Sequence, residues 1–117
     1  LAAELALLRE HVDPELVGVY LDVAWAFSAG GYPLALIAEF SRRCIGYHMR
    51  NLRADTVPTE GLADGVLDIP AMVHAIATAG HRGWIGLELW HRNDVQSKRP
   101  MIECQQEAVL YLKTLLR

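Results

Sequence analysis

The chain has 117 residues, of which 52% are hydrophobic and 21% are charged, a composition typical of one small globular domain. Its net charge of -3, with Lys and Arg scattered along the chain, argues against nucleic acid or an anionic membrane as a partner. No run is long enough to span a membrane, and the two cysteines lack C-x-x-C spacing, so we expect a reduced, cytoplasmic protein.

The first half of the chain alternates between helical and strand patterns. Apolar residues at helical spacing predict an amphipathic helix over residues 1–12, and an apolar, β-branched run predicts a strand over 16–22. A glycine-containing loop over 28–33 ends in a proline that suits the first turn of a helix over 33–42. A second apolar strand is expected over 43–49.

The second half repeats this order after a long loop. Residues 51–67 carry proline, glycine and several acids, which is typical of a functional loop. Asp68, with proline two residues later, predicts the start of a helix that Gly80 ends. A third strand is expected over 84–89 and a last helix over 98–116.

The fold class predicted from this order is α/β, because strands that are apolar on both faces and separated by helices form parallel sheets with right-handed crossovers. Three parallel strands leave two unpaired sheet edges and little surface on which to seat four helices. We therefore expect residues 1–117 to be one part of a larger domain: a helix followed by three strand–helix units.

The carboxyl ends of the three strands carry metal-capable side chains. With the two-residue period of a strand, the residues that share a face are Gly18, Tyr20 and Asp22, then Cys44, Gly46 and His48, then Gly86 and Glu88. Small residues on one face indicate crowding, as at the axis of a barrel. Asp22, His48 and Glu88 would then meet at the barrel mouth and suit a divalent ion such as Mn, Mg, Co or Zn.

Each of these residues also has a purely structural interpretation. Asp22 could cap a helix, His48 could be a hydrogen-bonded core residue, and Glu88 could pair with a neighbouring arginine. Three such side chains in register at three successive strand ends favour the metal site over three separate coincidences.

Four sequence blocks resemble a known family. The blocks LDVAWAFSAGGYP, IGYHMRNLR, GVLDIP and AGHRGWIGLE are similar to the C-terminal part of the xylose isomerase-like sugar phosphate isomerase/epimerase superfamily. This superfamily includes ketose 3-epimerases, inosose dehydratases, hydroxypyruvate isomerases and, more distantly, endonuclease IV. The resemblance runs from about Val17 to the end of the chain and is specific for the superfamily rather than for one substrate.

The resemblance implies a metal-dependent (β/α)8 TIM barrel of which this chain supplies the last three strands. Asp22, His48 and Glu88 match three of the family's four metal ligands, and the fourth, a glutamate on the preceding strand, would lie upstream of Leu1. In relatives that isomerise or epimerise sugars, two glutamate ligands also act as bases through an enediolate. Glu88 matches one of these bases.

The chain departs from the family pattern near the expected site. Trp25 stands where many relatives have a substrate-contacting histidine, so an apolar wall replaces that contact. Asn51 stands where the common H-x-K-D block has an aspartate, which removes a negative charge near the metal. Arg53 matches the arginine of the block and is either a ligand for a substrate hydroxyl or acidic group or a solvated loop residue. Trp90 and His91 could line the pocket.

The resemblance implies that the parent protein is an enzyme acting on a small sugar or polyol, most simply an isomerase or epimerase. An inosose-type dehydratase is the alternative reaction. A different class of function is a non-catalytic half-barrel that covers its open edges with a partner chain or with a copy of itself. Metal-dependent nuclease action suits the fold but not an acidic chain without a basic patch.

Overall fold

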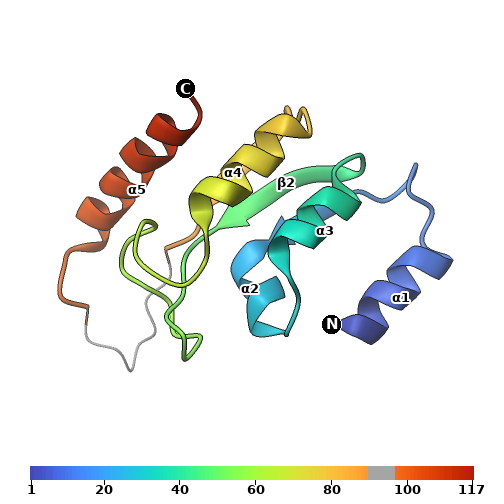
Figure 1. The fold of residues 1–117 in the computed structure, drawn as a ribbon, viewed down its shortest axis with the longest axis horizontal. Coiled ribbons are helices and arrows are strands. Elements are labelled where there is room, and N and C mark those ends of the chain that lie inside the picture. Colours follow the sequence, from blue (N-terminus) through green and yellow to red (C-terminus); the bar gives the residue numbers. More distant parts are fainter. Residues whose placement is uncertain (90–96) are drawn as a thin grey trace.

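The computed structural model describes residues 1–89 and 97–117 and confirms the alternation of helices and parallel strands (Figure 1). The elements in chain order are α1 (Ala2–His11), β1 (Val19–Asp22), α2 (Val23–Ser28), α3 (Pro33–Phe40), β2 (Cys44–Met49), α4 (Ile69–Thr78), β3 (Trp84–Leu87) and α5 (Met101–Leu115). The strands form one parallel sheet in the order β1-β2-β3, so β2 is central. The α/β class and the parallel pairing follow the sequence-based prediction.

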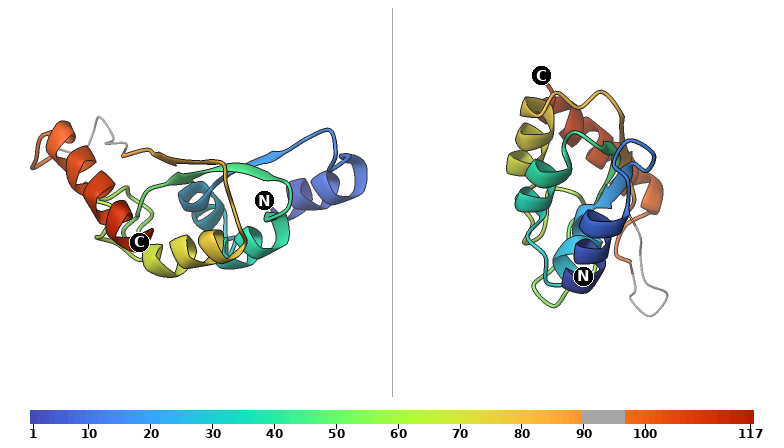
Figure 2. Two further views of the ribbon diagram at one scale, coloured as in Figure 1. Left: turned by 90° about the horizontal axis from the view of Figure 1, so that it is seen from above. Right: turned by 90° about the vertical axis from the view of Figure 1, so that its right-hand side faces the viewer.

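The helices α3, α4 and α5 lie on one side of the sheet and form an arc around it (Figure 2). In the part of the chain that the structure describes, no helix covers the opposite face. The residues buried between sheet and helices include Leu21, Ile37, Tyr47, Met49, Val73, Ile76, Cys104 and Ala108. The sheet thus has a covered face, packed against these helices, and an open face.

The helix α4 begins and ends where the sequence indicates. The side chain of Asp68 accepts a hydrogen bond from the Ala71 N–H at 2.9 Å and caps the first turn. Gly80 follows the helix with a φ of 73°, a conformation that glycine adopts without steric cost. The predicted start and stop signals are therefore confirmed.

The first strand is shorter and less buried than predicted. Pairing begins at Val19, whose N–H donates to the carbonyl of Arg43, and the preceding Leu16 is 81% exposed. Tyr20, on the open face, is also exposed. Within the described residues, packing covers only the face of β1 that is turned toward the helices, and burial of the other face inside a complete barrel stays a prediction.

The start of β2 contains a register shift that the sequence pattern did not reveal. Val19 pairs with Cys44 and Tyr20 pairs with Gly46, so Ile45 is an extra residue in β2. Cys44 packs against the core near Tyr47, where burial raises the pKa of the Tyr47 phenol. The prediction that Cys44 shares a face with Gly46 and His48 is wrong, since one extra residue reverses the alternation.

One further element and two boundaries differ from the prediction. The short helix α2 was not expected, β3 ends at Leu87 rather than at residue 89, and α5 begins at Met101 rather than at residue 98. The backbone still continues the ladder beyond β3, because the Glu88 N–H donates to the Met49 carbonyl at 3.2 Å. Among the described residues, no helix is both long and apolar enough to cross a membrane.

Candidate metal centre

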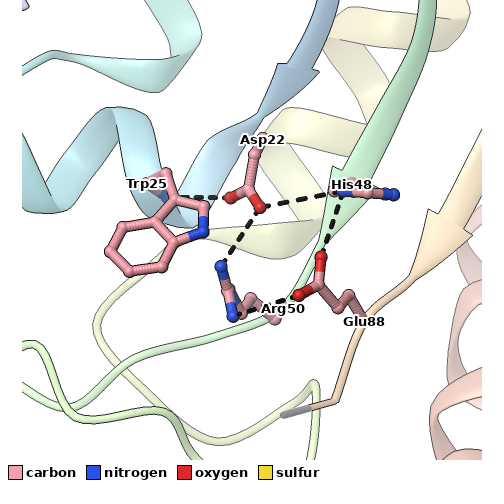
Figure 3. Close-up of polar contacts among 5 residues, drawn as sticks. All are labelled: Asp22, Trp25, His48, Arg50 and Glu88. Carbon is pink, nitrogen blue, oxygen red and sulfur yellow. Dashed lines mark hydrogen bonds and ion pairs between the residues drawn. The ribbon is translucent and has the colours of Figure 1, made fainter.

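The carboxyl ends of the three strands bring Asp22, His48 and Glu88 together (Figure 3). Asp22 pairs with His48 in the sheet register, and Glu88 lies two residues beyond the partner of His48 on β3. The His48 Nδ1 atom lies 3.1 Å from Glu88 Oε2 and 3.8 Å from Asp22 Oδ2. The predicted meeting of these three side chains is therefore what the structure shows.

The donor set suits a small divalent ion. One imidazole nitrogen and two carboxylate oxygens all lie within 4.8 Å of one another. Ligand atoms on opposite sides of an ion with bonds of about 2.1 Å are about 4.2 Å apart, so only a small side-chain adjustment separates this cluster from a coordination shell. The three side chains are also partly exposed, which leaves room for further ligands.

Asp22 both caps a helix and belongs to the cluster, because each of its two carboxylate oxygens has a different partner. Its Oδ1 atom accepts a hydrogen bond from the Trp25 backbone N–H at 2.8 Å and caps α2. Its Oδ2 atom faces His48 and the cluster. The cap holds the carboxylate in one orientation, because rotation would break the bond to the first turn of α2.

Two glycines on the open face make space for the side chains below the cluster. A Cβ atom at Gly46 would lie 2.5 Å from the ring of Tyr20, and one at Gly86 would lie 3.0 Å from the ring of His48. The rings of Tyr20 and His48 meet edge to face with centroids 4.8 Å apart. The predicted crowding on this face is thus present, and it packs the imidazole of His48 against Tyr20.

The sequence reasoning missed Arg50, which completes the cluster. Its side chain is only 3% exposed, and its Nη2 and Nη1 atoms lie 3.2 Å from Asp22 Oδ2 and 3.6 Å from Glu88 Oε1. The signal was in the sequence, because the two-residue period that relates Gly46 to His48 places Arg50 next on the same face.

A cavity of about 260 Å³ opens beside Arg50. Its wall consists of Ala24, Trp25, Ser28, Arg50, Leu52, Thr56 and Pro58. Trp25 is 60% exposed, and the guanidinium of Arg50 lies over its ring at 4.9 Å from the centroid. The indole therefore presents an apolar surface next to the metal-capable cluster.

Comparison with solved structures identifies the fold. The chain superposes on a xylose isomerase domain protein of Alicyclobacillus acidocaldarius with a TM-score of 0.74 at 18% identity, over 99% of this chain and 42% of that one. A sugar phosphate isomerase/epimerase of Parabacteroides distasonis gives 0.72 at 16% identity, over 97% and 37% of the two chains. A protein that fuses a xylose isomerase-like TIM barrel to a 4-hydroxyphenylpyruvate dioxygenase gives 0.66 at 20% identity, over 96% and 19%.

The chain has the fold of part of a xylose isomerase-like TIM barrel. No family model matches it. The rhizopine catabolism protein MocC of Rhizobium meliloti is 28% identical over 94 residues, covering 66% of this chain and 29% of that protein. The chain thus spans less than half the length of these relatives.

Arg53 lies apart from the cluster of this partial barrel. It is 55% exposed, and its guanidinium pairs with Asp55, at 3.2 Å between Nη2 and Oδ2. The hydrogen bond from Arg53, with one from the Val57 N–H, holds the pKa of Asp55 below its ordinary value. The arrangement is that of a solvated loop pair, and a role in substrate binding stays a prediction.

Asn51, the other departure from the family pattern after β2, is buried. It is 1% exposed, its amide nitrogen donates to the carbonyls of Leu62 and Leu67, and its oxygen accepts from the N–H groups of Leu52 and Leu67. The Asn51 side chain is therefore fully engaged in anchoring the long loop, and the loss of a negative charge near the metal stays a prediction. Trp90 and His91, expected near the pocket, lie outside the described residues.

Proposed function

We propose that the protein to which this chain belongs is a divalent-metal-dependent isomerase or epimerase of a small sugar or polyol. The observation that carries the proposal is the cluster of Asp22, His48 and Glu88 at the strand ends of an isomerase-like barrel. These three residues are the proposed ligands. Mn, Mg or Co suits the oxygen-rich set best, and Zn is an alternative.

Glu88 is the proposed catalytic base. Its carboxylate is 41% exposed at the strand end, where a bound substrate can reach it. It would take a proton from the carbon next to the substrate carbonyl and, in an isomerisation, return it to the neighbouring carbon. In an epimerisation, the second glutamate, on the opposite side of the substrate, would deliver a proton to the other face of the same carbon, so that no atom is lost in either reaction. A divalent ion bound at the cluster would stabilise the negative charge that develops on the substrate oxygens.

Trp25 and Arg53 are the proposed substrate contacts. The exposed indole of Trp25 offers an apolar surface to the C–H face of a sugar, beside the cavity that Arg50 also lines. Arg53 is exposed on the long loop and would donate to a substrate hydroxyl or acidic group. Both residues lie on segments that follow a strand's carboxyl end, which is where TIM barrels carry their active sites.

The two unpaired edges of the sheet and the apolar clefts beside them support a proposal about what covers them. An apolar cleft of about 320 Å³ lies between α1 and β1, and another of the same size lies beside β3 and α5. Both β1 and β3 are paired on one side only within the described residues. We propose that the remaining strands of the barrel cover these edges and supply the fourth metal ligand, a glutamate. A non-catalytic half-barrel completed by a partner chain or a second copy is the alternative.

Dehydration is the alternative reaction at the same site. Removal of the proton by Glu88 starts both reactions, and the outcome depends on whether the proton returns or the neighbouring carbon loses a hydroxyl group. Product analysis separates the two, since a dehydratase releases water and an isomerase preserves the mass of its substrate.

The experiment that tests the function uses the full-length protein, a panel of ketoses and cyclic polyols, and deuterated water. We expect deuterium to enter the product carbon, and Glu88→Gln to slow turnover by about 100-fold or more, because general-base catalysis contributes at least that much. The matched control is Glu107→Gln, because Glu107 is an exposed glutamate of α5 that pairs with Arg99, outside the cluster. Unchanged turnover in Glu88→Gln would show that the base is wrongly assigned, and no turnover by the full-length protein would favour the non-catalytic alternative.

A further inference from the structure

Arg50 is the most buried charged residue of the described chain and the one with the most contacts to the proposed ligands. Its guanidinium lies between Asp22 and Glu88, on the side of the two carboxylates away from His48 (Figure 3). The ring of Trp25 packs on it at 4.9 Å. A buried side chain held from three directions has little freedom to leave this place.

We propose that Arg50 is a positioning residue that holds the carboxylates of Asp22 and Glu88 in place and fixes which oxygen of Glu88 is presented to the metal. The inference rests on the proposed metal site. Arg50 itself needs no contact with the ion or the substrate for this role, because it acts through the two carboxylates.

Glu88 depends on Arg50 more than Asp22 does. Its Oε2 atom faces His48 Nδ1 at 3.1 Å, while its Oε1 atom faces Arg50 Nη1 at 3.6 Å. Arg50 thus contacts only Oε1, and the Oε2 atom stays beside His48, where it could bind the ion together with the imidazole. Glu88 lies beyond the end of β3 and is partly exposed, so its long side chain needs such a contact to keep one rotamer.

The Asp22 carboxylate is also held by a backbone hydrogen bond, which the Glu88 carboxylate lacks among the described residues. Its Oδ1 atom is held by the Trp25 N–H, and Arg50 Nη2 lies 3.2 Å from the remaining Oδ2 atom. Loss of Arg50 would therefore leave Asp22 oriented by the cap of α2 but would leave the Oε1 atom of Glu88 without its cation. The expected consequence is disorder at Glu88 in particular.

If Arg50 served only to neutralise the two carboxylates, its removal would have the opposite effect on cation affinity. With His48 neutral, Asp22, Glu88 and Arg50 together carry a charge of -1, and removal of Arg50 would make it -2. If Arg50 only neutralised charge, its removal would strengthen the binding of a divalent cation, because the repulsion between two positive groups would be gone. If Arg50 positions the ligands, its removal weakens binding, and the two roles differ in sign.

The Nε atom of Arg50 is buried too, in addition to the Nη atoms that face the carboxylates. It has no hydrogen-bond partner among the described residues, which is unfavourable for a buried donor. Arg43, at the other end of β2, also has a buried Nε without a partner, and its Nη2 atom donates to the Val17 carbonyl at 2.8 Å. Arg43 is therefore a matched arginine, next to the start of β2 and away from the strand ends that carry the cluster.

The test measures Mn²⁺ affinity by calorimetry and the visible absorption of bound Co²⁺ in the full-length protein. We expect Arg50→Met to weaken Mn²⁺ binding by about 10- to 100-fold, the usual effect of losing a residue that orients metal ligands. The Co²⁺ spectrum should change as well, because Glu88 would no longer present one fixed oxygen. Arg50→Lys should restore part of the affinity, since a lysine can reach one carboxylate but not both. Arg43→Met should leave both readouts unchanged.

Tighter or unchanged Mn²⁺ binding by Arg50→Met would overturn the inference. If that variant does not fold, as judged by circular dichroism, Arg50→Lys decides the question, and wild-type affinity together with a wild-type Co²⁺ spectrum would overturn it. His48→Ala separates this failure from failure of the proposed function. If His48→Ala binds Mn²⁺ like the wild type, the metal site itself is wrong, whereas loss of binding in His48→Ala with no weakening in Arg50→Met refutes the role of Arg50 alone.

Discussion

The two faces of the sheet use the same three strands for different purposes. The covered face presents apolar side chains such as Leu21, Tyr47 and Met49 to the helices. The open face carries Tyr20, two glycines and, at the strand ends, the charged cluster. The covered face therefore holds the fold together, while the open face holds the groups that can perform chemistry.

Two consecutive residues show how sharply this division is drawn. Arg50 and Asn51 follow β2 and are both almost fully buried. Arg50 lies with the carboxylates of the cluster, whereas Asn51 turns into the long loop and bonds four backbone groups there. Two neighbouring residues after β2 thus lie on different sides of the sheet. We expect substitution of Arg50 to change the cluster and substitution of Asn51 to change the stability of the long loop.

The largest effect on stability is expected from Asn51→Asp, on the covered side. A carboxylate cannot donate to the buried carbonyls of Leu62 and Leu67, so two acceptors lose their partner and a charge is buried. We expect a loss of about 3 kcal/mol or more in the free energy of unfolding. Chemical denaturation of the full-length protein measures it.

The reverse substitution in the same loop, Asp55→Asn, is the control for this experiment. Asp55 is exposed, so the change should fall within about 0.5 kcal/mol of the wild type. If Asn51→Asp were as mild, the amide of Asn51 would not be what holds the long loop.

An intermediate effect is expected from Gly46→Ala, on the open face. The added methyl group would lie 2.5 Å from the ring of Tyr20, so the ring must shift. We expect a cost of about 1–3 kcal/mol, as for other overpacked positions. The double variant Tyr20→Ala/Gly46→Ala should lose much less than the sum of the two single variants, because removal of the ring relieves the clash. Additive losses would show that Tyr20 does not define the space at Gly46.

The smallest effect is expected at the periphery, where Arg9 of α1 pairs with Glu39 of α3 at 2.6 Å. The hydrogen bond from Arg9 lowers the pKa of Glu39, so the pair stabilises the docking of α1 above the ordinary pKa of a glutamate. This contribution is lost as the pH falls through the lowered pKa. Hydrogen exchange should show weaker protection of α1 in acid, and Glu39→Gln should remove that pH dependence. Equal pH dependence in the variant would place its origin elsewhere.

The sequence was informative wherever a local signal decided the structure. The proline at the start of α3, the cap at Asp68 and Gly80 after α4 indicated helix ends, and the two-residue period indicated that Asp22, His48 and Glu88 would meet. These features depend on residues that are close in the chain or on the alternation of side chains along a strand, and both can be recognised in the sequence.

The remaining features depend on contacts that the pattern does not contain. The extra residue Ile45 is determined by the register in which β1 pairs with β2. Leu16 is exposed because β1 begins only at Val19 and no described element packs on Leu16. The role of Asn51 in anchoring the long loop was not predicted, because its partners Leu62 and Leu67 lie 11 and 16 residues away in a loop without a regular pattern. Arg50 could have been found by extending the strand period past His48 by one step.

The central claim is that Asp22, His48 and Glu88 form a divalent-cation site, and calorimetric titration of the full-length protein with Mn²⁺ tests it most directly. We expect saturable binding by the wild type and a loss of affinity of about 100-fold or more in His48→Ala, because the cluster then has no nitrogen ligand. Failure of the wild type to bind Mn²⁺ or Co²⁺, or equal affinity in His48→Ala, would contradict the account.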